Sequence, residues 1–432
     1  MAVTELVLRY ADLGIATYGS LRVVGDPART VTWVVEEPLL LAALEEIEGA
    51  LPEIQPGETI ETALERAFNR GAFAHRDTES VLAYHLGVLL LPDAAWRLLQ
   101  DCVADPRAVL FVAPTARLAR VPWPILALPA IRPTAEEMVR ARTEAFTDAG
   151  PMPARIEWPD DMSRCTEGYR LLELVEVMAA VPVSITQTSR PGPSDPDGAP
   201  LLILDPRVPG QLPSSPLGSV LGRPAAQTPV ARHFAGVLER GPVLPDTADV
   251  VELFRRSDAD RGWLADMLGR GPGRMLFVGH CSAATEDSSA EQASLHLAEV
   301  DPLTAADVLA SDLVFPPRVA VLACASGGDY RFDEAIGLVA ALVMRGARLV
   351  TAALWSLPTT AGYRRFAPAQ DPAADPMAGL IAGVDDAHSR PDAGCAVNRW
   401  QRAEMRRWRD GDGTANPLYW AALVTFAVDG AR

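Results

Sequence analysis

Residues 318–328 of this chain read RVAVLACASGG, and residues 274–281 read RMLFVGHC. Each stretch opens with a short apolar run, which predicts a strand buried on both faces. Helical patterns flank these strands at 258–269 and 303–311. An alternation of strands and helices predicts an α/β fold with a mainly parallel sheet covered by helices.

The same alternation continues toward the end of the chain. The pattern predicts a helix at 333–345, a strand at 347–355, an amphipathic helix at 397–408 and a last strand at 421–428. Earlier segments are assigned as follows: short strands in the first 35 residues, helices over 37–103, a strand at Val181–Thr186, and irregular Pro/Gly-rich chain over 206–245. A Pro-, Gly- and Asp-rich loop at 188–200 suggests two parts, residues 1–195 and 200–432.

Composition excludes several classes of protein. The net charge of −17 over 432 residues argues against nucleic acid and anionic membranes as partners. No secretory signal is seen in the opening MAVTELVLRY, and no apolar run is long enough to span a membrane, so we expect a cytoplasmic protein. The five cysteines are widely spaced and form no Cys/His cluster of zinc spacing, so we expect no metal and no cofactor.

All 39 basic residues are arginine. Codon bias in a GC-rich genome explains the absence of lysine and fits the richness in Ala, Arg, Pro and Gly. Selection against amines, for example to resist self-cleavage after lysine, is the alternative. Both interpretations remain open.

Two residues suited to acyl chemistry stand at the ends of predicted neighbouring strands, His280 and Cys324. Reactive residues collect beyond the carboxyl ends of the strands in an open α/β sheet, so these two are expected to meet. His280 would then accept the thiol proton of Cys324, and the backbone N–H groups of Cys281 and Cys324 would form an oxyanion hole. The alternative is structural, because a cysteine that ends an apolar strand is commonly a small buried hydrophobe.

Six segments, in order, resemble the CHAT family of caspase-like domains related to separase. They are LFVAPTARLARVPWPIL, LLILDP, Gly279-His280-Cys281, the turn Leu322–Gly327, the helix start Asp333–Leu338, and Leu354-Trp355, followed by the ending NPLYWAALVTFAVDG. The resemblance covers most of residues 35–432. It implies a caspase-hemoglobinase-like fold, with a catalytic part at 200–432 and a non-catalytic, pseudo-protease-like subdomain at 1–195.

The resemblance also implies a function. We expect a cysteine endopeptidase with a His280/Cys324 dyad, acting on proteins or peptides and regulated by a protein partner in bacterial signalling, defence or programmed death. The alternatives are a catalytically silent interaction module, or pseudoprotease, and a thiol acyltransferase on the same fold. Cys281 departs from the family, which has glycine after the histidine.

The substrate pocket is less constrained than the dyad. Asp329, Asp333 and Ser326 follow the nucleophile closely and are candidates to line it. With the acidity of the chain, the two aspartates favour a basic residue at P1, the substrate position before the cleaved bond. Caspases instead have arginines in this pocket, which bind an acidic residue at P1. A helix N-cap is the competing role of Asp333.

Overall fold

The computed structural model divides the chain into two compact units, residues 1–180 with 408–411, and residues 181–407 with 412–432. The described residues are 3–14, 16–103, 107–145, 165–187, 197–212, 217–283, 289–324, 326–327, 337–367, 374–428 and 431. The boundary at 180/181 precedes the predicted loop at 188–200. No helix among these residues is both long and apolar enough to cross a membrane.

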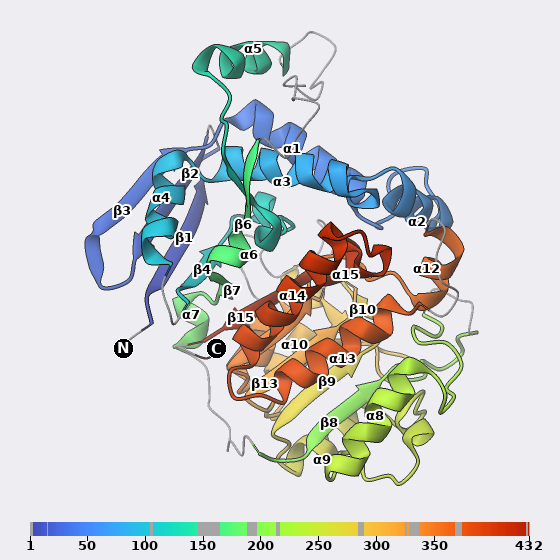
Figure 1. Ribbon diagram of the computed structural model, residues 1–432. Coiled ribbons are helices and arrows are strands. Elements are labelled where there is room, and N and C mark those ends of the chain that lie inside the picture. Colours follow the sequence, from blue (N-terminus) through green and yellow to red (C-terminus); the bar gives the residue numbers. More distant parts are fainter. Residues whose placement is uncertain are drawn as a thin grey trace. The chain divides into compact units, whose positions relative to one another are not determined.

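The first unit contains a mixed sheet in the order β3-β2-β1-β4-β7 (Figure 1). The strands are β1 (Glu5–Asp12), β2 (Thr17–Val23), β3 (Asp26–Val34), β4 (Val109–Ala113) and β7 (Glu176–Ala180). β1, β2 and β3 are antiparallel, whereas β1, β4 and β7 run parallel. The short strands expected in the first 35 residues are therefore confirmed.

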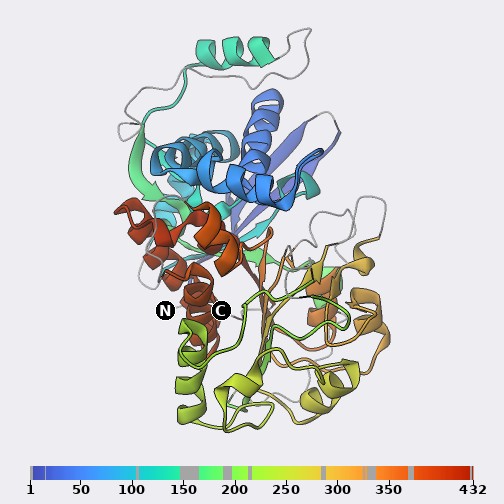
Figure 2. The same ribbon diagram turned by 90° about the vertical axis from the view of Figure 1, so that its right-hand side faces the viewer.

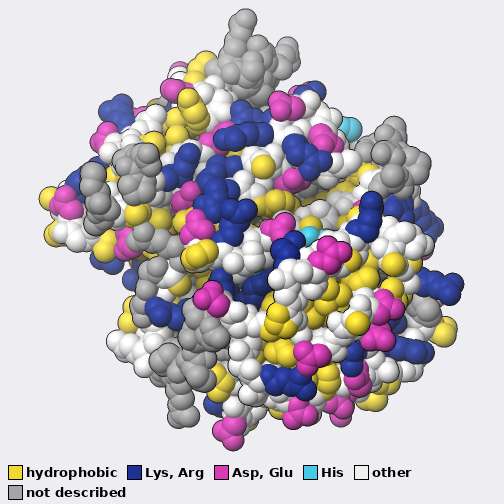
Figure 3. All heavy atoms as spheres, turned by 60° about the horizontal axis from the view of Figure 1, so that its bottom comes forward, with side chains coloured by type: hydrophobic (Ala, Val, Ile, Leu, Met, Phe, Trp, Pro, Cys, Tyr) yellow, Lys and Arg dark blue, Asp and Glu magenta, His cyan; other side chains and the backbone are white. Residues whose placement is uncertain are grey.

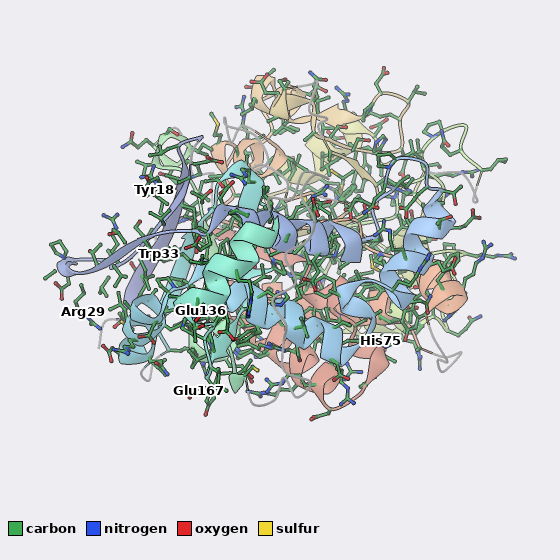
Figure 4. All side chains as sticks on the ribbon, turned by 90° about the horizontal axis from the view of Figure 1, so that it is seen from above. Tyr18, Arg29, Trp33, His75, Glu136 and Glu167 are labelled. Carbon is green, nitrogen blue, oxygen red and sulfur yellow. The ribbon has the colours of Figure 1, made fainter. Side chains whose placement is uncertain are left out.

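Helices of the first unit come mainly from the segment 37–103, as expected. They are α1 (Glu37–Ala50), α2 (Ile60–Asn69), α3 (Arg76–Leu90) and α4 (Asp93–Cys102), followed by α5 (Ala135–Ala145), the short α6 (Leu171–Leu174) and the strand pair β5 (Ala127–Pro129) and β6 (Thr166–Arg170). Figure 4 labels Trp33 on the hairpin of β2 and β3. Its indole lies where a Cβ at Gly19, the opposite residue, would be, so only glycine fits there.

The second unit contains the strand order β15-β14-β13-β9-β8. The strands are β8 (Pro200–Leu204), β9 (Arg274–Val278), β13 (Arg318–Leu322), β14 (Leu349–Ala353) and β15 (Leu423–Ala427). β8, β9, β13 and β14 are parallel, and β15 is antiparallel to β14. Every residue of β9 and of β14 is buried, as expected for strands covered on both faces.

Helices of the second unit lie on both faces of these strands (Figure 2). α13 (Pro376–His388) contacts β9, β13 and α8, whereas α11 (Leu338–Met344) contacts β14 and α10. The remaining helices are α7 (Val183–Thr186), α8 (Pro229–Arg240), α9 (Arg261–Gly269), α10 (Ala305–Ala310), α12 (Thr360–Phe366), α14 (Ala393–Arg409, whose last residues belong to the first unit) and α15 (Pro417–Trp420). The predicted α/β class, with a mainly parallel sheet between helices, is confirmed.

Two local predictions are wrong. Val181–Thr186 is not a strand: the strand ends at Ala180, and Pro182 precedes the short helix α7. The segment 206–245 is not wholly irregular, because it contains α8. That helix begins with a Thr228 N-cap and a proline at its first position, which are strong start signals inside a Pro/Gly-rich stretch.

A buried polar cluster lies at the amino end of β9, away from the strand ends that carry His280 and Cys324. Asp385 accepts hydrogen bonds from Arg274 and from His233 Nε2, the latter at 2.9 Å. His233, Asp385 and the neighbouring Asp386 are grouped closely enough to hold a metal ion. The Arg274 guanidinium already faces Asp385, so the cluster is an internally compensated ion-pair network.

His388 belongs to this cluster and makes the stability depend on pH. It is fully buried, its Nε2 lies 2.8 Å from Thr351 Oγ1, and burial, followed by the charge of Arg274, lowers its pKa from 6.5 to about 3. In the unfolded chain His388 becomes protonated below about pH 6.5, whereas in the folded chain it stays neutral down to about pH 3. Stability is therefore lost as the pH falls.

We expect His388 to remove about 2 kcal/mol from the free energy of unfolding between pH 7.5 and pH 5. Chemical denaturation of wild type and His388→Gln at both pH values measures this contribution. The difference in stability between the two proteins should shrink by about that amount at pH 5. Equal pH dependence in both proteins would contradict the assignment.

Candidate active site

His280 and Cys324 follow two adjacent parallel strands. In the register of β9 and β13, Val278 is paired with Leu322, so His280 and Cys324 each lie two residues beyond the same paired position. The Gly279 N–H donates to the Leu322 carbonyl at 3.4 Å and extends the pairing by one residue. Neighbouring strands lie about 4.8 Å apart, so the two residues share one edge of the sheet.

A backbone carbonyl orients the imidazole of His280. The ring is half-buried, and its Nε2 lies 2.9 Å from the Gly218 carbonyl oxygen. A carbonyl oxygen only accepts hydrogen bonds, so Nε2 carries the proton. In the neutral ring Nδ1 is then the nitrogen with the lone pair, and it is the atom that can accept a proton from a thiol.

The Gly218 carbonyl is itself held by an ion pair. Arg255 Nη1 donates to this oxygen at 3.1 Å and to Asp205 Oδ1 at 3.3 Å. Asp205, which is fully buried, also accepts hydrogen bonds from the next three residues of the Gly218 loop: the Ser219 hydroxyl at 2.7 Å and the Val220 and Leu221 N–H groups at 3.1 and 3.2 Å. One carboxylate therefore fixes the loop that orients His280.

Left-handed backbone coincides with this ion pair. Asp205 and Arg255 both have φ of 53°, and within the described residues they are the non-glycine residues with positive φ. Left-handed backbone is costly for side chains other than Asn and Asp, and it concentrates at functional sites. Sequence reasoning missed both residues, although an Asp directly after the buried run LLIL, at a strand's carboxyl end, was the available signal.

The residue after His280 begins a small antiparallel sheet of β10 (Cys281–Ser282), β11 (Ser294–Leu295) and β12 (Leu303–Thr304). The His296 N–H donates to the His280 carbonyl at 3.0 Å, and Cys281 faces Leu295. This is the non-hydrogen-bonded position of an antiparallel ladder, so the Cys281 N–H points away from β11. That direction is compatible with the expected oxyanion role.

A second imidazole lies close to the first. His296 is buried, its Nε2 lies 2.7 Å from Ser282 Oγ, and burial, followed by the charge of His280, lowers its pKa. His296 therefore stays neutral at pH 7. The sequence offered no spacing signal for this pair.

Of the three predicted pocket residues, the structure describes Ser326. Its side chain is 2% exposed, and its hydroxyl donates to the Val321 carbonyl at 2.8 Å and accepts from the Ala353 N–H at 3.1 Å. It thus fastens the turn after Cys324 to β13 and β14, and we do not include it in the substrate pocket. Asp329 and Asp333 lie outside the described residues.

The comparison with family models agrees with the resemblance seen in the sequence. The family model for the CHAT domain matches residues 152–427. Two crystal structures of the Saccharomyces cerevisiae separase–securin complex align with 10% and 9% identity and TM-scores of 0.42 and 0.41, over 99% and 98% of this chain. The chain spans 30% of the length of those separase chains. Curated protein sequences give no match. The chain belongs to the CHAT-domain family.

Proposed function

We propose that this protein is a cysteine endopeptidase in which Cys324 is the nucleophile and His280 the general base. The observation that carries the proposal is the shared register of the two residues at the ends of β9 and β13. The hydrogen bond from His280 Nε2 to the Gly218 carbonyl supports it, because that bond leaves Nδ1 for the thiol.

The proposed reaction has two steps. His280 Nδ1 takes the proton of the Cys324 thiol, and the thiolate attacks the peptide carbonyl carbon. The N–H groups of Cys281 and Cys324 stabilise the developing oxyanion. His280 then gives its proton to the leaving amine, which releases the first product and leaves a thioester on Cys324. Water, activated by His280, hydrolyses this thioester and restores the thiol.

The ion pair of Asp205 and Arg255 has a positioning role in this mechanism. It fixes the Gly218 carbonyl, and the carbonyl interacts more strongly with His280 when the ring is a cation. The imidazolium formed after proton transfer is thus stabilised by a prearranged dipole. Burial of Asp205 keeps the arrangement rigid.

The cellular role we propose is that of a regulated bacterial protease in the cytoplasm, acting in signalling, defence or programmed death. The separase chains of the comparison were solved in complex with securin. By analogy, we propose that a protein partner controls this chain too. For P1 specificity we keep the basic preference, which the acidity of the chain and the residues Asp329 and Asp333 favour.

A catalytically silent interaction module is the second candidate. The observation in its favour is Cys281, whose half-buried side chain stands where the family has glycine, beside the oxyanion position. A thiol acyltransferase would use the same dyad but pass the acyl group to an acceptor other than water.

Incubation with a mixed peptide library, followed by mass spectrometry, tests the endopeptidase proposal. We expect new peptide ends in the wild-type digest that are absent after thiol alkylation, and cleavage after arginine or lysine. Cleavage after aspartate alone would overturn the basic P1 preference. A library left intact with and without candidate partner proteins would contradict the endopeptidase and favour the interaction module. Acyl transfer to added amines without hydrolysis would favour the transferase.

A further inference from the structure

A pocket of about 670 Å³ lies in the second unit, next to the loop that orients His280. Its walls come from the loop after Gly218, the start of α8, the segment around the start of α12, and the start of α13. The lining residues used below are Arg207, Ser219, Arg223, Arg255, Arg364 and Asp375.

The charge of this pocket is opposite to that of the chain. Four arginines line it, against one aspartate, in a protein of net charge −17. On the face drawn in Figure 3, basic and acidic side chains are interspersed, and many arginines elsewhere are in ion pairs. The cationic lining is therefore a local feature that the overall composition does not explain.

The arginines of the pocket differ in what they bind. Arg255 is engaged by Asp205, whereas the exposed Arg207, Arg223 and Arg364 form no ion pair or side-chain hydrogen bond with any residue in the described ranges. The aspartate does not neutralise them. Asp375 Oδ1 accepts from the Thr360 hydroxyl at 2.6 Å and from the Ala378 N–H at 3.0 Å, where it caps α13. Three guanidinium groups thus remain for a ligand.

The pocket and the candidate dyad share a wall. Ser219 lines the pocket, and the residue before it supplies the carbonyl that binds His280. Arg255 also lines the pocket and donates to that same carbonyl. His280 and Cys324 themselves are not part of the lining. The loop that orients His280 is therefore also a wall of this pocket.

We propose that this pocket binds an acidic side chain of the peptide substrate, at a position other than the cleaved bond. This inference rests on the proposed peptidase function and names a second element of its specificity. Arginine suits the role, because its planar fork binds a carboxylate through two parallel hydrogen bonds. The substrate then combines an anchoring Asp or Glu with the cleavage site, and recognition weakens as salt screens the exposed arginines.

Binding measurements on the Cys324→Ala protein test the pocket without cleavage. Two fluorescently labelled peptide mixtures are compared by anisotropy, identical except that one carries glutamate where the other carries glutamine. We expect the glutamate mixture to bind about tenfold more tightly at low salt. Arg223→Gln and Arg364→Gln should each weaken binding of the glutamate mixture about threefold, and the double variant should bind both mixtures about equally.

Arg348→Gln is the matched control. Arg348 is exposed and in the same unit. It lies just before β14, at the amino end of the parallel strands, whereas His280 and Cys324 follow the carboxyl ends. Its replacement should leave binding unchanged. Equal binding of both mixtures, or no difference between the Arg223 and Arg348 variants, would overturn the inference. If inorganic phosphate displaces both peptide mixtures and the two mixtures bind equally well, the pocket is a site for small anions. That result would also overturn the inference.

The experiments can contradict the proposed pocket and the proposed peptidase function separately. Glutamate-dependent binding in a protein that cleaves nothing would contradict the peptidase and leave an acidic-peptide binding site. Cleavage by wild type that is indifferent to glutamate and to Arg223 would contradict the pocket and leave the peptidase standing.

Discussion

Cys324→Ala is expected to lower kcat/KM for peptide cleavage about 10⁴-fold or more, to the background of the assay. Removal of a nucleophile leaves only what binding and the oxyanion hole contribute, and in proteases the loss reaches this size. Cys324 follows β13 at the edge of the sheet and is half-buried, so its replacement creates no large core cavity. The unfolding temperature should stay close to that of wild type.

Two further cysteine variants show which thiol reacts. Cys395→Ala, on α14, is the matched control and should keep full activity. Cys281→Ala retains the backbone N–H beside His280 and should keep most activity. Loss of cleavage in Cys281→Ala together with full activity in Cys324→Ala would exchange the roles of the two cysteines. Undiminished cleavage by Cys324→Ala alone would already contradict the proposed nucleophile.

Asp205→Asn is expected to lower kcat/KM about tenfold to 100-fold, mainly through kcat, by loosening the loop that orients His280. Asparagine keeps the size of the side chain and tolerates the left-handed backbone at this position, where φ is 53°. It removes the charge that pairs with Arg255, and its amide cannot accept all the hydrogen bonds of the carboxylate. The Gly218 carbonyl then loses its fixed direction.

The pH profile distinguishes positioning from a general loss of stability. With the Gly218 carbonyl less fixed, the cation that His280 forms on proton transfer is less well stabilised, so the acidic limb of kcat/KM, where activity rises as the general base becomes neutral, should move to lower pH in the variant. Asp392→Asn, an exposed carboxylate paired with Arg399, is the control and should leave the profile unchanged. A variant with wild-type kcat and pH profile but a lower unfolding temperature would show that Asp205 is purely structural.

Hydrophobic patterning predicts much of the second unit, because buried parallel strands are short, apolar and separated by helices. The strands expected at 274–279, 318–323 and 347–355 are found as β9, β13 and β14. The error at 181–186 has a local cause. An apolar run of this length is compatible with a strand or a short helix, and packing against α11 decides between them.

The pocket residues illustrate a different limit. A small polar residue after a nucleophile can face either the cleft or the sheet, and Ser326 faces the sheet because two backbone groups, on β13 and β14, need its hydroxyl. The arginine pocket draws on residues as far apart as Arg207 and Arg364. No periodicity or motif links them, so they become visible together only after folding.

The sequence by itself determined the α/β class, the family, and the placement of His280 and Cys324 at strand ends, because these follow from local apolar patterning and short ordered segments. Tertiary structure alone decided how His280 is oriented. The Gly218 carbonyl, Arg255 and Asp205 come from three separate segments. The pairing of β8 with β9 brings Asp205 beside the strand that leads to His280, and the bridge between Leu204 and Phe254 brings Arg255 to the end of β8. Contacts between residues distant in sequence depend on the whole fold, and no local pattern of residue types encodes them.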